Sequence, residues 1–89
     1  MHISKHAQVR MQQRAISTRT LNILNQYGRK VHDGHKGIIV FLDKKAKDRI
    51  RMDLPKQEYL KIERKLDVYC VESDGQIITV GHRYKPVHH

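Results

Sequence analysis

The sequence predicts an α+β domain in which two N-terminal helices pack on an antiparallel sheet of about four strands, with an additional helical segment before the last two strands. Three observations predict this fold class. Apolar residues recur at helical spacing near the start of the chain, which predicts helices. Farther along, β-branched runs flank Gly-containing turns, which predicts strands. The 89 residues, 38% of them hydrophobic, suffice for one modest core. We therefore expect a single domain over residues 1–89, with residues 85–89 as a flexible tail.

The first two helices are predicted from their caps and their apolar spacing. One runs from Lys5 to Arg14 after the N-cap residue Ser4, and its apolar stripe recurs every four residues: Ile3, Ala7 and Met11. The second covers residues 18–27, between Ser17 as N-cap and a Gly that ends it at the C′ position, Gly28, with an inward face of Leu21, Leu24 and Tyr27. Because the connection is short, the two form a helical hairpin.

Four segments read as strands. Residues 29–33 and 37–42 flank a Gly-containing turn, and residues 67–72 and 76–84 flank Asp74-Gly75, a strong hairpin signal. Period-two alternation places Ile78, Val80, His82 and Tyr84 on one face of the last strand and Ile77, Thr79, Gly81 and Arg83 on the other. We expect three aromatic side chains in the core: Phe41, Tyr59 and Tyr69.

The segment between these hairpins is the least determined. Alternation of Ile50, Met52 and Leu54 is typical of a strand, whereas Ala46, Ile50 and Leu54 follow helical spacing. Asp43 as a possible N-cap favours a helix for residues 44–54. Pro55 then opens another helix that extends to about Leu66, with an inward face of Tyr59, Ile62 and Leu66.

Charge is unevenly distributed along the chain. Lys and Arg number 18 against 9 Asp and Glu, a formal net charge of +9. Residues 1–36 hold seven basic side chains and one acidic one, so we expect these cations to lack partners, whereas residues 68–89 hold two of each sign. Unpaired positive charge on a small domain favours a polyanion, above all nucleic acid. The expected phosphate ligands are Lys5, Arg10, Arg14, Arg19, Arg29, Lys30 and Lys85.

Composition also argues against several classes of protein. No apolar run approaches the ~18 residues of a membrane span and no secretory segment is recognisable, so we expect a cytoplasmic protein with no membrane partner. The single cysteine, Cys70, excludes a disulfide framework and a cysteine-rich zinc site, and we expect it to be a buried small hydrophobe. His32 and His35 lack the two further ligands that zinc needs, so no metal or other cofactor is expected.

The first predicted helix carries the residues of greatest chemical interest. His6, Arg10 and Arg14 fall at i, i+4 and i+8 and form one row beside the apolar stripe. Such a row suits binding or cleavage of a phosphodiester, because histidine transfers protons near neutral pH and arginine holds two phosphate oxygens at once. Two neighbouring arginines repel each other, which also points to a functional surface.

A second group of chemically active side chains closes the last strand: His82, Arg83 and Tyr84. We expect His82 to be the partner for proton transfer, Arg83 to bind phosphate, and Tyr84 to stack on a base or donate its hydroxyl. Structural alternatives stand beside these roles. Either histidine can simply lie at the helix–sheet boundary, the arginines can pair with acids or with main-chain carbonyls, and Tyr84 can cover the edge of the core.

Residues 4–17, Ser-Lys-His-Ala-Gln-Val-Arg-Met-Gln-Gln-Arg-Ala-Ile-Ser, resemble the S-x-H-A-x-x-R-M-x-x-R-x-I-S opening of a small bacterial and phage domain family of unknown function. That family is grouped with RelE/BrnT-like toxins in the barnase–EndoU–colicin–RelE fold. Residues 74–85 are similar to its closing strand, roughly dG-x-I-x-T-V-x-x-R. Ala15 stands where the family usually has Gly, and residues 43–66 depart from the pattern with additional helix.

The resemblance implies two N-terminal helices against an antiparallel sheet, and metal-independent RNA cleavage by a toxin that an antitoxin neutralises. The matching positions are His6, Arg10, Arg14 and Arg83. The implied partners are RNA, free or on the ribosome, and an acidic antitoxin. The residues alone leave two alternatives open: a non-catalytic RNA- or DNA-binding module, and an antitoxin-type protein-interaction domain whose basic face docks an acidic partner. They leave the oligomeric state open as well.

Overall fold

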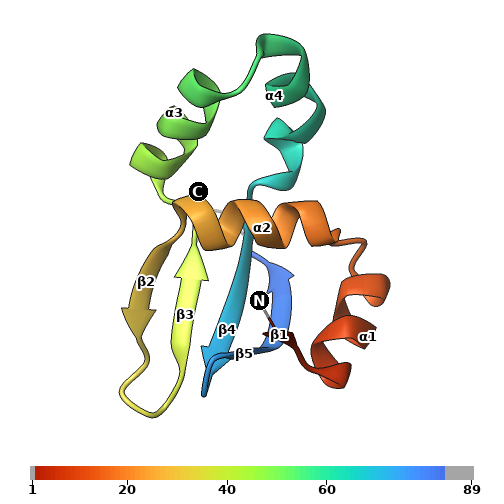
Figure 1. The fold of residues 1–89 in the computed structure, drawn as a ribbon, viewed down its shortest axis with the longest axis vertical. Coiled ribbons are helices and arrows are strands. Elements are labelled where there is room, and N and C mark those ends of the chain that lie inside the picture. Colours follow the sequence, from red (N-terminus) through yellow and green to blue (C-terminus); the bar gives the residue numbers. More distant parts are fainter. Residues whose placement is uncertain (1, 84–89) are drawn as a thin grey trace, which may run out of the picture.

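A five-stranded mixed sheet forms the base of the fold in the computed structural model, which describes residues 2–83 (Figure 1). In the order β1-β5-β4-β3-β2 its strands are β1 (His2–Ile3), β5 (Gln76–His82), β4 (Val68–Ser73), β3 (Ile38–Phe41) and β2 (Arg29–His32). The α+β class is confirmed, but the purely antiparallel sheet of about four strands is wrong. Ile3 pairs with Ile77 in a short strand, β1, that runs parallel to β5 and was not predicted.

The helices of the described residues are α1 (Lys5–Gln13), α2 (Thr18–Tyr27), α3 (Lys44–Asp53) and α4 (Lys56–Ile62), followed by a 3-10 turn, Glu63–Lys65. Three predicted N-caps are confirmed, because the side chains of Ser4, Ser17 and Asp43 each accept a main-chain N–H three residues on. Residues 44–53 are helical, which buries Ile50 and leaves Met52 82% exposed. None of these helices is long and apolar enough to span a membrane.

Within residues 2–83, helices cover one face of the sheet and none crosses the other. Helix α2 crosses the covered face, while α3 and α4 project beyond the end of the strands (Figure 1). Val40, Cys70 and Val80 pair in register across three strands on the covered face and are at most 2% exposed. They share one apolar core with Leu21 and Leu24 of α2. We call the opposite side, where the alternate residues are mostly half-buried, the open face.

Two predictions about the strands are wrong. Phe41 and Tyr69 are half-buried and belong to the open face, because they alternate with Val40 and Cys70. On β5, a register shift opposite Val71 and Glu72 interrupts the alternation, so that Ile77 is 1% exposed and Ile78 is 37% exposed. Regular alternation would have placed the two isoleucines the other way round.

The backbone at the ends of α1 and α2 also differs from expectation. Gly28 has an ordinary φ of −66° and not the left-handed conformation of a C′ residue. A Cβ there would lie 2.3 Å from the Leu24 oxygen and 2.4 Å from Val40 Cγ1, so its small size permits α2 to approach β3. Ala15 is left-handed instead, with φ 53°, at the position where the resembled family has Gly. It ends α1, and the next N–H, that of Ile16, bonds to Met11 O.

Candidate nucleic-acid interface

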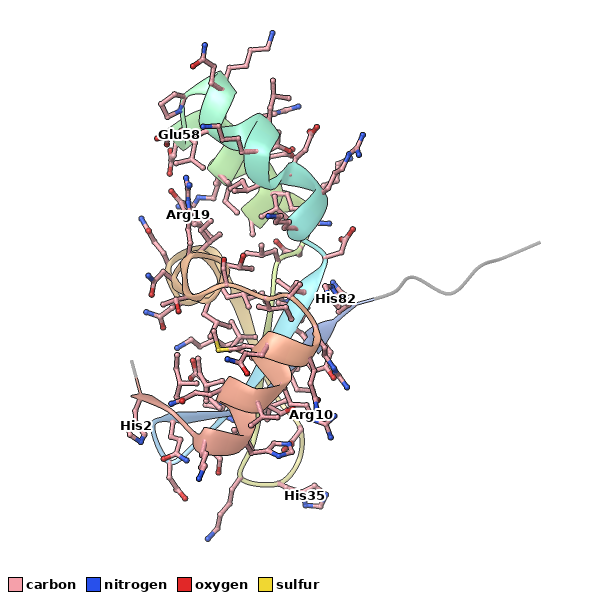
Figure 2. All side chains as sticks on the ribbon, turned by 90° about the vertical axis from the view of Figure 1, so that its right-hand side faces the viewer. His2, Arg10, Arg19, His35, Glu58 and His82 are labelled. Carbon is pink, nitrogen blue, oxygen red and sulfur yellow. The ribbon has the colours of Figure 1, made fainter. Side chains whose placement is uncertain are left out.

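His6, which is exposed, and Arg10, which is half-buried, form a pair on α1. Arg10 Nε donates to His6 Nε2 over 3.5 Å, and Arg10 Nη1 donates to Gln13 Oε1 over 3.3 Å. Because Nε2 accepts this bond, the neutral imidazole carries its proton on Nδ1. Figure 2 shows Arg10 projecting from α1 on the side of the open face. The pair therefore places the basic nitrogen of an imidazole against a guanidinium, joined by a hydrogen bond long enough to be weak.

Arg14, the third member of the predicted row, is anchored to the sheet. Its Nη1 donates to the main-chain oxygen of Val80 over 3.1 Å, and its own main-chain oxygen lies 2.7 Å from His82 Nε2. A carbonyl oxygen only accepts, so His82 Nε2 must carry the proton. The two residues thus tie the end of α1 to β5. Of the two roles that the sequence left open for Arg14, phosphate binding and a bond to a main-chain carbonyl, the structure contains the second.

Ion pairs separate the predicted phosphate ligands into two groups. Within residues 2–83 the pairs are Arg19–Glu58 (3.8 Å), Arg29–Asp43 (4.0 Å), Lys30–Glu72 (3.7 Å), Arg51–Asp48 (3.6 Å) and Lys47–Asp67. The expectation that the first segment's cations lack partners is therefore wrong for Arg19, Arg29 and Lys30, because acids of later segments fold against them (Figure 2 labels Arg19 and Glu58).

The cations of α1 form the other group. Lys5, Arg10 and Arg14 take part in none of the ion pairs among the described residues. Since exposed ion pairs contribute only about 0–1 kcal/mol, even the paired cations can exchange a carboxylate for a phosphate. The positive charge of α1, however, has no carboxylate to displace among residues 2–83. It is the part of the molecule most ready to meet an anion.

A further row of side chains, which sequence reasoning did not assemble, crosses the open face next to α1. Arg29, Phe41, Tyr69 and Gly81 are paired in register on β2, β3, β4 and β5. The space over Gly81 is filled by two neighbours, since a Cβ there would lie 2.7 Å from both Arg14 Nη1 and Tyr69 Cε1. The row therefore continues into α1.

Arg83 completes this arrangement. Its guanidinium carbon lies 4.1 Å from the centroid of the Phe41 ring, a cation–π contact. Arg83 and Gly81 share the open face, as alternation predicts, whereas His82 pairs with Val68 and turns to the other face. The predicted site residues His82 and Arg83 are therefore not brought together. The sequence did not indicate Phe41 and Tyr69 as site residues, because the apolar strands that contain them were predicted to lie in the core.

Two hollows lie near these residues. One, of about 460 Å³, opens beside Phe41. Its charged lining residues are one acid, Asp43, and four cations: Arg29, Lys44, Lys47 and Arg83. The other, of about 440 Å³, lies between α1, α2 and β1 and is lined by no charged residue. Only the first has the electrostatics of an anion site.

Other candidate chemistry receives less support. Among residues 2–83 no group of three or more His, Cys, Asp or Glu side chains is placed to hold a metal ion. Burial raises the pKa of the Cys70 thiol to about 12, so it is no nucleophile at neutral pH. The predicted site residues Tyr84 and Lys85 lie outside the described residues.

Comparisons of the chain with protein-family models, with curated proteins and with solved structures found no match. Function is therefore argued from the side chains. They present an imidazole, several cations and two half-buried aromatic rings on adjoining surfaces, a combination that suits a nucleic acid better than a small neutral ligand.

Proposed function

We propose that the protein is a metal-independent ribonuclease of the RelE/BrnT-like toxin type, acting in the cytoplasm. The observation that carries the proposal is the contact between His6 and Arg10, 3.5 Å apart on an exposed helix whose cations have no carboxylate partner among the described residues. It supplies a proton acceptor and a phosphate ligand side by side, as cleavage of RNA by its own 2′-hydroxyl requires.

In this mechanism the bond from Arg10 Nε to His6 Nε2 breaks as the guanidinium turns to the phosphate. His6 Nε2 then accepts the proton of the 2′-hydroxyl as its oxygen attacks the adjacent phosphorus. Arg10, and Arg14 from the edge of β5, stabilise the charge that builds on the phosphate oxygens. Arg83, which lies over Phe41, binds a phosphate of a neighbouring nucleotide. The leaving 5′-oxygen takes a proton from a second group, for which Tyr84 is the stronger candidate because His82 Nε2 already bonds to the Arg14 carbonyl. The products are a 2′,3′-cyclic phosphate and a free 5′-hydroxyl.

Incubation of the purified protein with single-stranded RNA in excess chelator tests this proposal. The wild-type chain should cleave the RNA and leave 2′,3′-cyclic phosphate ends, and His6→Ala should slow cleavage about 100- to 10,000-fold, the usual contribution of a general base. His35→Ala is the matched control, since it removes an exposed histidine from the β2–β3 turn, on the other side of the sheet from α1 (Figure 1). Intact RNA with both wild type and His6→Ala would refute the ribonuclease proposal.

A non-catalytic RNA- or DNA-binding module is the second candidate. It is favoured by the hydrogen bonds that commit Arg14 and His82 to main-chain atoms, which suit a scaffold better than proton transfer. Such a module would bind nucleic acid in a salt-dependent manner, with affinity that survives His6→Ala and falls in Arg10→Ala. Under either function, an acidic antitoxin would inhibit by covering Lys5 and Arg10.

A further inference from the structure

We propose that the open face binds single-stranded RNA, with an unpaired base stacked on the outer side of the Arg83–Phe41 pair and the neighbouring nucleotide over Tyr69. This inference deepens the proposed function by naming the form of RNA that is bound. It can be tested without cleavage, because neither Phe41 nor Tyr69 takes part in the proposed proton transfer and His6 takes no part in the proposed stacking. The argument rests on the register of the sheet, the stacked guanidinium and the distribution of charge.

The register of the sheet places the aromatic rings next to each other on one face. Phe41 and Tyr69 are directly opposite in neighbouring antiparallel strands, and both are half-buried. Strands lie about 4.8 Å apart, so the rings stand at a spacing that successive unstacked bases can match. Tyr69 has room to lie flat here because Gly81, its partner on β5, has no side chain. A larger residue at position 81 would occupy this surface.

Arg83 extends the stacking surface. Its guanidinium lies over the Phe41 ring, with 4.1 Å between the guanidinium carbon and the ring centroid, and the residue is exposed. One side of the planar group is therefore covered by the ring, and a base can stack on the other side. Arg83 takes part in no ion pair among the described residues, so its charge is available to a phosphate or to the base.

Cations lie at both ends of the aromatic pair. At one end, the charged hollow of about 460 Å³ offers Arg29, Lys44 and Lys47 to the RNA backbone. At the other end stand Arg14 and, farther along α1, Arg10. A strand stacked on the rings can thus have its phosphates bound on both sides and run towards His6. Duplex RNA cannot use this surface, because pairing keeps its bases stacked inside the helix.

The experiment measures binding with no cleavage to confound it. The full chain carrying His6→Ala is titrated, in chelator, against a fluorescent 12-nucleotide RNA of mixed sequence, either as a single strand or in a perfect duplex. Each base–aromatic stack contributes about a 5- to 150-fold change in affinity. We expect the single strand to bind at least about 10-fold more tightly than the duplex, and Phe41→Leu to remove most of that difference.

Arg83→Lys sharpens the test, because it keeps the positive charge on an exposed residue. We expect single-strand affinity to fall at least about fivefold while the dependence of affinity on salt is unchanged, since stacking is lost and the number of phosphate contacts is kept. Arg51→Lys, the same change on helix α3, is the matched control and should leave affinity within about twofold. If Arg83 had only a structural role, Arg83→Lys would leave the affinity for single-stranded RNA unchanged.

Two results would overturn the inference: equal affinity for single strand and duplex, or single-strand affinity within about twofold of the His6→Ala background in both Phe41→Leu and Arg83→Lys. Failure of the proposed function gives a different signature. A chain with native His6 that leaves RNA intact, but binds single strands through Arg83 and Phe41, refutes the ribonuclease and supports this inference. Conversely, if Arg83→Lys and Phe41→Leu alter neither cleavage nor binding of RNA, the ribonuclease proposal is supported and this inference is refuted.

Discussion

The two faces of the sheet use the same strands for opposite purposes. Strand β3 shows the contrast most directly, because all four of its residues are apolar and yet only Val40 is buried. On the covered face Val40 packs under α2 with Cys70 and Val80. On the open face the neighbouring residue, Phe41, is half-buried and contacts the guanidinium of Arg83.

This difference teaches that apolar content in a strand does not by itself identify the core. A strand has two faces, and a helix that packs on only one of them leaves the apolar side chains of the other near solvent. Half-buried aromatic rings among cations are typical of a binding surface. The comparison can be tested by changing residues on the two faces one at a time.

The largest expected effect is on the covered face. Val40→Ala should lower the free energy of unfolding by about 2–3 kcal/mol, because it removes two buried methyl groups and leaves a cavity under α2. Ile39→Ala, at the next residue on the open face, should cost about 1 kcal/mol or less although it removes more atoms. Urea denaturation measures both. Equal losses would show that the open face is packed as tightly as the covered one.

Alkaline pH gives a second test of the covered face. Burial raises the pKa of the Cys70 thiol from 9.0 to about 12, so its contribution to stability is complete below pH 9 and falls as the pH rises towards 12, where the unfolded chain loses the proton first. The wild type should therefore lose more stability than Cys70→Ala between about pH 8 and pH 10.5. Tyrosines and lysines titrate in both proteins, so the difference isolates the thiol. Parallel losses would contradict its burial.

The smallest effect on stability is expected where the open face meets α1. In Gly81→Ala the new Cβ would stand 2.7 Å from both Arg14 Nη1 and Tyr69 Cε1, so the ends of these side chains must move. Because side-chain ends shift at little cost, we expect a loss of about 1 kcal/mol or less in unfolding free energy, but a several-fold loss of affinity for single-stranded RNA. Thr79→Ala, on the same strand and face, is the control. Unchanged affinity in Gly81→Ala would remove Tyr69 and Arg14 from the binding surface.

Part of the candidate site could be predicted and part could not. Helical spacing was enough to align His6 with Arg10, and the two are in contact. The position of His6 and Arg10 relative to the sheet could not be predicted, because it depends on which strand borders α1. Arg14 meets Val80 across 66 positions of sequence, and the sequence contains no local signal for such a bond.

What the sequence by itself determined is local. The N-caps and the Asp74-Gly75 turn, where both residues have positive φ, follow from interactions over a few residues. For residues 44–53 the Asp43 cap only favoured a helix over a strand. Only the tertiary structure decided that β1 joins the sheet in parallel, that the bulge buries Ile77, and that Arg83 stacks on Phe41. These features depend on strand order and register, in which a shift of one residue exchanges the two faces of a strand.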